Sequence, residues 1–197
     1  QVVYGAAVSW LFGFSFETLR LSVAALGVMG AVGTLFLLTE VGASRTAAWV
    51  GSLTLLLMPS YVQHAFTFMT DVPFTTLVVW SVLFYVRALR TGAAASVVAG
   101  TVLAVCATLV RQPGVMLPLA FCVARLAFMP RSEWSLHSLT KAIVPVAVVV
   151  AVYLLYQAII RHHHMEPALL GSFERTLRKQ VSEQGVLEAA VWPAKRL

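Results

Sequence analysis

The residues of this chain that could do chemistry are few, and Asp71 is the first to consider. It is the only aspartate among eight acidic residues, and it stands in the stretch FTFMTDVPF, between two long apolar runs. A positioned carboxylate can act as a general base toward a hydroxyl group. Asp71 also precedes Pro73 by two residues, and aspartate and proline are both favoured where a helix begins. The alternative is therefore that Asp71 is only a helix N-cap.

Two further residues have side chains that suit an anionic substrate. Arg111 carries a planar, permanently charged guanidinium group, whose donors match a phosphate. His64 lies seven residues before Asp71, in the loop that leads to it, and could bind an acceptor or a phosphate. The alternatives are an interfacial anchor for Arg111 and a solvated loop residue for His64.

The elements that position these residues must lie in a membrane. Hydrophobic residues make up 59% of the chain and charged residues only 11%, whereas about a quarter of an average soluble domain is charged. The mean hydropathy is +0.85. The formal net charge of +6 fits lysine and arginine beside anionic lipid headgroups. No basic stripe interleaved with aromatic residues is present, so nucleic acid is not expected as a partner.

Six apolar segments approach the length of about 17–25 residues that a membrane span needs. They cover residues 21–39, 46–64 with a kink at Pro59, 73–89, 94–110, 114–129 and 142–160. The sequence therefore predicts an all-α, polytopic transmembrane helical bundle of about six spans. We expect residues 1–160 to form this domain and residues 161–197 to form a polar, helical extramembrane tail. Residues 1–16 are apolar but short and interrupted by glycine, and are either the remnant of a span or an interfacial segment.

The basic residues in the loops predict the orientation. One side of the bundle carries more of them, and the positive-inside rule makes that side cytoplasmic. These residues are Arg45, Arg87, Arg90, Arg131 and Lys141. Asp71 and Arg111 then share the outer face.

Three stretches resemble one known superfamily. They are LFGFSFETLRLSVAALGVMGAVGTLFLL, LLLMPSYVQHAFTFMTDVPFTTLVVWSVLFYVRAL and AVCATLVRQPGVMLPLA. The second contains an M-T-D-x-P element at the start of a span, and the third an R-Q-x-G turn between two spans. In this order and spacing they resemble the C-type glycosyltransferases, especially bacterial relatives of protein mannosyltransferases and of the lipid A aminoarabinose transferase.

The resemblance implies an inverting enzyme in the plasma (inner) membrane, with its active face outward. It would move a sugar from a polyprenyl-phosphate carrier to a lipid, glycan or protein acceptor, among membrane lipids. Asp71 would be a catalytic carboxylate, matching the family's secondary aspartate, while Arg111, Gln112 and His64 would bind substrate. The cofactor is unknown, and the resemblance leaves a divalent metal open.

The resemblance also implies a principal catalytic acid in the first outer loop. No acidic residue precedes Glu17, which begins a span and does not fit that motif. We therefore expect the chain to be the N-terminal half of an enzyme without its upstream part. The alternative is a fragment of a secondary transporter or permease that uses Asp71 and Arg111 as substrate or proton contacts. The enzyme is favoured because transporters place such groups near the membrane midplane, and here they gather at the span boundaries.

Overall fold

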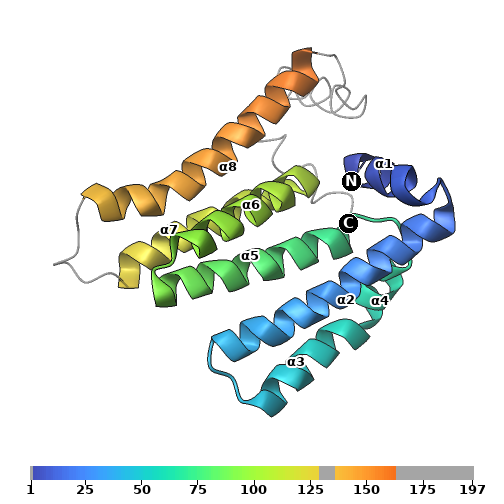
Figure 1. Cartoon of the computed structure of the whole chain (residues 1–197), viewed down its shortest axis with the longest axis horizontal. Helices are drawn as coiled ribbons and strands as arrows, with labels where there is room; N and C mark the ends of the chain where they lie inside the picture. The colour runs from blue at the N-terminus through green and yellow to red at the C-terminus, as the bar shows by residue number, and fades with distance from the viewer. Residues whose placement is uncertain (1, 129–135, 163–197) are drawn as a thin grey trace, which may run out of the picture. The chain divides into compact units, whose positions relative to one another are not determined.

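Every regular element in the described part of the chain is a helix. The structure, a computed structural model, describes residues 2–128 and 136–162. The helices are α1 (Val2–Phe12), α2 (Phe16–Glu40), α3 (Arg45–Leu57), α4 (Pro59–Ala65), α5 (Asp71–Thr91), α6 (Ala94–Val110), the 3₁₀ helix η1 (Gln112–Val115), α7 (Met116–Phe128) and α8 (Leu136–His162) (Figure 1). The predicted all-α class is confirmed.

The predicted spans correspond closely to these helices. Three helices are long and apolar enough to cross a membrane, namely α2, α5 and the Leu139–His162 part of α8. The predicted kink is a break: Met58, with ψ of 123°, separates α3 from α4 just before Pro59. With α6 and the η1–α7 segment as shorter apolar helices, six spans fit the chain.

The chain divides into two compact units, Gln1–Tyr153 and Leu154–Leu197. The first contains α1 to α7 and most of α8, and it carries all the predicted site residues. Of the second unit, the structure describes the last turns of α8. The predicted tail, residues 161–197, lies outside the described residues from position 163 onward.

Helix α5 lies between α2 and α6 and packs closely against both (Figure 1). Small residues on α2 permit the approach: a Cβ atom added to Gly30 would lie 2.7 Å from Oγ1 of Thr76. The hydroxyl of Thr76 donates to the carbonyl of Leu26 at 2.8 Å, and the indole N–H of Trp80 donates to the carbonyl of Met29 at 3.0 Å. Because these contacts advance in the same direction along both helices, α2 and α5 run parallel, and they begin at the same end.

Helices α5 and α6 form an antiparallel hairpin. Gly92 ends α5 in the left-handed conformation with φ of 68°, and its N–H donates to the carbonyl of Ala88. Glycine adopts this conformation without steric cost. Midway along the hairpin, the buried hydroxyl of Ser81 donates to the carbonyl of Gly100 at 2.9 Å. The start of α5 and the end of α6 are thereby brought to the same end of the bundle.

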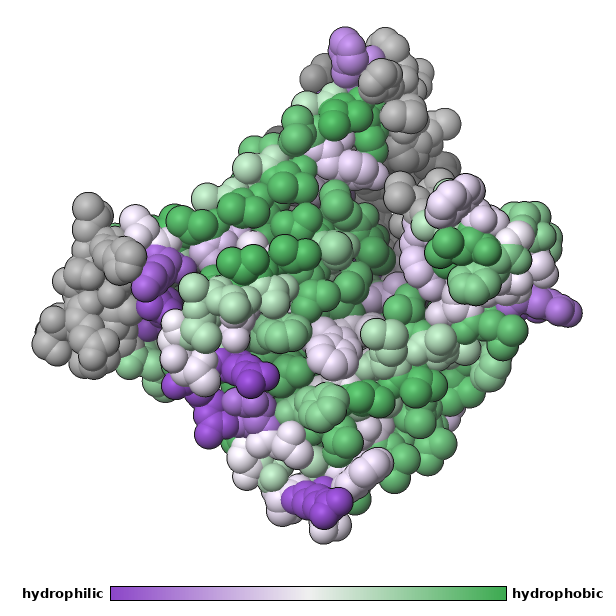
Figure 2. Space-filling model, in the orientation of Figure 1, coloured by the Kyte–Doolittle hydropathy of each residue, from purple (hydrophilic) through white to green (hydrophobic). Residues whose placement is uncertain are grey.

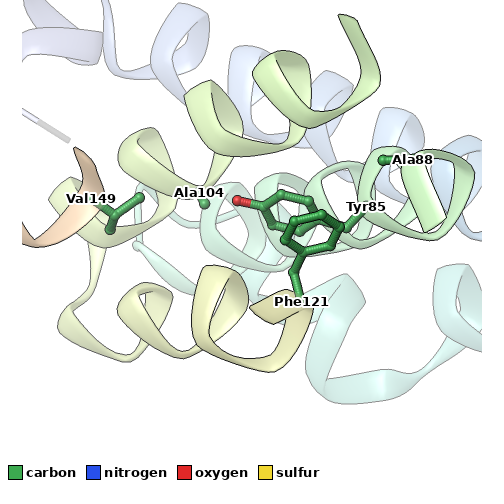
Figure 3. Close-up of a cluster of buried hydrophobic side chains, with 5 residues drawn as sticks. All are labelled: Tyr85, Ala88, Ala104, Phe121 and Val149. Carbon is green, nitrogen blue, oxygen red and sulfur yellow. The ribbon is translucent and has the colours of Figure 1, made fainter. Parts of the chain in front are cut away.

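A small aromatic core fixes this hairpin to its neighbours. The rings of Tyr85 and Phe121 stack with centroids 4.5 Å apart, between α5 and α7 (Figure 3). Ala88, Ala104 and Val149, all buried, complete the cluster.

The outer surface is mostly apolar, as a bundle immersed in lipid requires. On the face shown in Figure 2, green apolar residues cover the middle and purple hydrophilic residues lie mainly at the margins. The exposed large hydrophobic residues include members of α2, α3, α6, α7 and α8. Such a surface would not stay monomeric in water, so the chain is an integral membrane protein.

Candidate functional site

The structure joins two residues that the sequence singled out separately. Arg111 Nη1 donates a hydrogen bond to Oδ1 of Asp71, and the two side chains form an ion pair. Asp71 begins α5, and Arg111 follows α6, so the pair lies at the open end of the α5–α6 hairpin. The side chains keep 40% and 45% of their accessible surface, respectively. The pair is therefore reachable by a ligand, and the prediction that both residues share one face is confirmed.

The turn after α6 holds Arg111 in place. Arg111 itself is extended, with φ of −147° and ψ of 135°, and its N–H donates to the carbonyl of Ala107 at 2.8 Å. Gly114 then packs directly on α6: an added Cβ would lie 2.7 Å from Cα of Thr108. A backbone atom cannot move away as a flexible side chain can, so this turn needs glycine. The turn formed by the R-Q-P-G sequence thus positions the Arg111 side chain next to Asp71, at the start of α5.

A third residue completes the site, and the sequence analysis did not identify it. The ring of Phe74 lies 5.9 Å from the Arg111 guanidinium carbon, a cation–π distance. Phe74 is partly buried and lies one turn after Asp71 on the same helix. The i, i+3 spacing of an aromatic and a carboxylate, opposite a conspicuous arginine, is the signal that could have found it.

The cap interpretation of Asp71 is wrong in this structure. Thr70 is the N-cap residue of α5, and Asp71 is the first residue of the helix. The carboxylate bonds to Arg111, and the backbone carbonyl of Asp71 accepts a bond from the hydroxyl of Thr75. A carboxylate in the first turn still gains from the helix dipole, by about 0.3–1 kcal/mol. Its hydrogen-bonding partner, however, belongs to another helix.

The other two predicted site residues are not brought into the pair. His64 is half-buried in the last turn of α4, and within residues 2–128 and 136–162 no hydrogen bond or ion pair joins its side chain to Asp71 or Arg111. Gln112 begins η1 beside Arg111 and is exposed. It is adjacent to the pair and free to turn toward a ligand. Glu17, as expected, is a helix-start residue: its N–H donates to the Ser15 hydroxyl that caps α2.

A divalent metal does not fit the pair as these residues stand. Such ions take several oxygen ligands, as many as six to eight for calcium, and here one carboxylate already faces a guanidinium. Nowhere in the described ranges do three or more histidine, cysteine, aspartate or glutamate side chains gather as a metal site would require.

A second ion pair marks the opposite end of α2 and α5. Arg90 Nη1 lies 3.7 Å from Oε1 of Glu40, joining the last turns of the two helices. Arg45 begins the next helix at that end. Arg45, Arg87 and Arg90, three of the basic residues used to predict orientation, therefore lie at the opposite end of α5 from the candidate site. Which of these ends faces outward stays a prediction.

The fold and site together define a class: a helical integral membrane protein with an accessible carboxylate–guanidinium pair at one end of its spans. The model of the dolichyl-phosphate-mannose-protein mannosyltransferase family matches residues 5–169. The chain belongs to this family, and it is accordingly a membrane glycosyltransferase, mannosyltransferase-like in class. No curated protein and no solved structure matches the chain.

Family membership confirms the resemblance that the sequence motifs indicated. It covers the whole described site, including α5, the R-Q-P-G turn and Phe74. It also favours the enzyme over the transporter, because the family is one of sugar transferases.

Proposed function

We propose that the protein transfers a sugar from a polyprenyl-phosphate carrier to a lipid, glycan or protein acceptor at the outer face of the plasma (inner) membrane. The observation that carries this proposal is the Asp71–Arg111 pair, in a chain of the mannosyltransferase family. In this proposal Asp71 is the proton acceptor and Arg111 is the cation that binds phosphate, and the two side chains lie together at the end of a spanning helix. A membrane-bound donor presents its phosphate at such a boundary.

Arg111 is the residue for the donor phosphate. Its guanidinium is always charged and can bind phosphate oxygens through two parallel bonds. Phe74 lies against the guanidinium and limits its orientations, which lowers the entropy lost when a phosphate binds. Gln112, exposed next to it, supplies an amide donor for a remaining oxygen, and His64 is a more distant candidate on the approach.

Asp71 is the residue for the acceptor. As the acceptor oxygen bonds to the anomeric carbon of the sugar, its proton passes to a carboxylate and the bond from that carbon to the carrier phosphate breaks. Attack from the side opposite the phosphate inverts the anomeric configuration. Arg111 stabilises the charge that collects on the departing phosphate. These roles need the phosphate to take over part of the bonding of Arg111, which leaves the Asp71 carboxylate free for the proton.

The apolar surface accounts for the rest of the donor. The polyprenyl tail requires contact with lipid or with a greasy protein surface, and exposed apolar side chains line the bundle along its spans. Transfer of each buried methylene group from water gains about 0.8 kcal/mol, so the tail keeps the donor in the membrane. Arg111 then selects the phosphate from lipids that already surround the protein.

The test compares two arginines in similar exposed ion pairs. Arg111→Gln removes the cation from the candidate site, and Arg90→Gln removes one from the Glu40 pair at the other end. Binding of polyprenyl-phosphate mannose to the full-length protein in nanodiscs would be measured by titration. We expect Arg111→Gln to weaken binding about tenfold or more, since a charge-assisted hydrogen bond contributes about 1.5–3 kcal/mol.

Arg90→Gln is expected to bind the donor as the unmodified protein does. Equal donor affinities for the two variants and the unmodified protein would show that Arg111 is an interfacial anchor. Equal losses in both variants would indicate a general effect of charge on the bundle. Either result contradicts the proposed role of Arg111.

A further inference from the structure

Four large aromatic residues gather at the corner between α1 and α2, with their side chains turned away from the protein. The exposed fractions are 85% for Trp10, 74% for Phe12, 72% for Phe14 and 71% for Phe16. We call these four residues the aromatic corner. Soluble proteins seldom expose several large aromatic side chains so close to one another in the chain, and an exposed apolar patch usually marks a binding surface.

The backbone of the aromatic corner has a defined conformation. Gly13, with φ of 81°, makes the turn after α1, and Ser15 caps α2. The rings of Phe14 and Phe16 meet edge to face with centroids 5.5 Å apart. The exposed aromatic side chains are therefore held in one place relative to α2.

The opposite face of α1 is the one that packs against the protein. The ring of Tyr4 stacks on Phe68 with centroids 6.3 Å apart, and Gly5 lies against Phe68 so closely that an added Cβ would be 2.9 Å from its ring. Val8 is also buried. Helix α1 therefore has one face buried against Phe68, whereas Trp10 and Phe12 on the same helix are exposed. The side of α1 that carries Trp10 and Phe12 is exposed and apolar, so it requires an environment other than water.

The length of α2 places the corner at the level of the lipid headgroups. The Glu40–Arg90 ion pair gives α2 and α5 a common level at their other end. From there to Phe16, α2 rises about 36 Å, whereas α5 rises about 28 Å to Asp71, at about 1.5 Å per residue. The hydrocarbon core of a bilayer is about 30 Å thick. Asp71 thus reaches the edge of the core, and the corner stands one headgroup layer beyond it.

We propose that the aromatic corner inserts into the interfacial layer of the membrane, on the side where Asp71 and Arg111 lie, and that its partner is the phospholipid surface. Tryptophan is enriched at this depth because its ring is apolar and its N–H is polar. Beyond Glu17 and Arg20, α2 continues with exposed apolar residues such as Leu21, which is 66% exposed. Figure 2 shows green and pale surface at the end of the molecule where α1 meets α2, with a purple hydrophilic group at its margin. Residues 2–16 carry no charge, and the exposed Glu17 and Arg20 that follow them are charged groups of a kind that lipid headgroups accept.

The chain carries a probe for this contact in Trp10. The full chain would be reconstituted in vesicles of phosphatidylcholine brominated either near the headgroup or deep in the acyl chain. The Trp10 signal is the emission of the unmodified protein minus that of Trp10→Phe, which keeps an apolar ring at an exposed position and leaves the fold unchanged. A matched Trp80→Phe difference serves as control, because Trp80 is bonded to α2 and only partly exposed.

We expect bromine near the headgroup to quench the Trp10 signal at least twofold more than deep bromine does, with aqueous iodide having a smaller effect. Strong quenching by iodide without quenching by either brominated lipid would place the corner in water. Absence of quenching by all three would show that protein covers it. Stronger quenching by deep bromine would make the segment part of a span. Each of these three results overturns the proposal, and none depends on transferase activity.

Discussion

Asp71→Asn is expected to have opposite effects on the two steps of the proposed reaction. The substitution keeps the shape of the side chain but removes the charge that faces Arg111. Turnover should fall because an amide cannot accept the acceptor proton, and the loss of a general base typically costs about a hundred- to ten-thousand-fold. Donor binding should instead improve, because the phosphate no longer competes with a carboxylate for the guanidinium.

The size of the binding gain follows from the exposure of the pair. Both side chains keep 40% or more of their surface, and an exposed ion pair is worth about 0.2–1 kcal/mol. Releasing Arg111 from it should tighten phosphate binding by about 1.5- to 5-fold. The same exposure limits the effect on folding, since the lost pair and the lost helix-dipole interaction together amount to about 0.5–2 kcal/mol.

The assay needs two measurements on one preparation. Titration of the nanodisc-embedded protein with polyprenyl-phosphate mannose gives the donor affinity, and single-turnover transfer of labelled mannose gives the rate. Glu40→Gln is the matched control, because it breaks the equivalent pair at the other end of α2 and α5, and it should change neither quantity. Near-normal turnover of a well-folded Asp71→Asn protein would refute the role of Asp71 in the chemistry. Weaker donor binding would refute the competition, and would mean that Asp71 holds Arg111 in place for the phosphate.

Three other substitutions or labels test the elements around the pair. Gly114→Ala should destabilise the protein by about 1–3 kcal/mol and weaken donor binding, because the added methyl group meets the backbone of α6; an unchanged melting temperature and donor affinity would contradict the role of the turn. Gly30→Val should lower the melting temperature measurably, since its Cβ would force α2 away from α5, whereas Val28→Ala on the exposed face of α2 should not; equal effects would refute the close packing. A cysteine introduced at Ser60 should react in intact cells with a thiol reagent that cannot cross the membrane, and a cysteine introduced at Thr91 should not react. The reverse pattern of labelling would show that the predicted orientation of the site is inverted.

Apolar length and helix signals were enough to predict most of the bundle. The segment predicted at 94–110 is helix α6 with the same bounds, and the break at Pro59 falls where proline denies α3 its continuation. These features are local, because a helix in lipid must satisfy all its backbone hydrogen bonds within itself. The family was also readable, because the M-T-D-x-P and R-Q-x-G elements are short, ordered stretches of sequence.

The sequence predicted only in part that Asp71 and Arg111 come close together. Asp71 lies 21 residues before Gly92, and Arg111 lies 19 residues after it. Two helices of similar length on either side of a tight turn bring such positions to the same end. The sequence therefore determined that the two residues share a face, but not that they touch.

Only the tertiary structure decided the partners of these side chains. Contact between Arg111 and Asp71 depends on how Gly114 packs the turn against α6, where an added Cβ would lie only 2.7 Å from Cα of Thr108. The position of Phe74 under the guanidinium, and the pairing of Glu40 with Arg90, follow from the rotation and crossing of helices that are far apart in sequence. Hydropathy carries no information on that rotation, because lipid accepts any apolar face of a helix equally well. Small residues let α2, α5 and α6 pack closely. The polar contacts that then form between these helices select one arrangement.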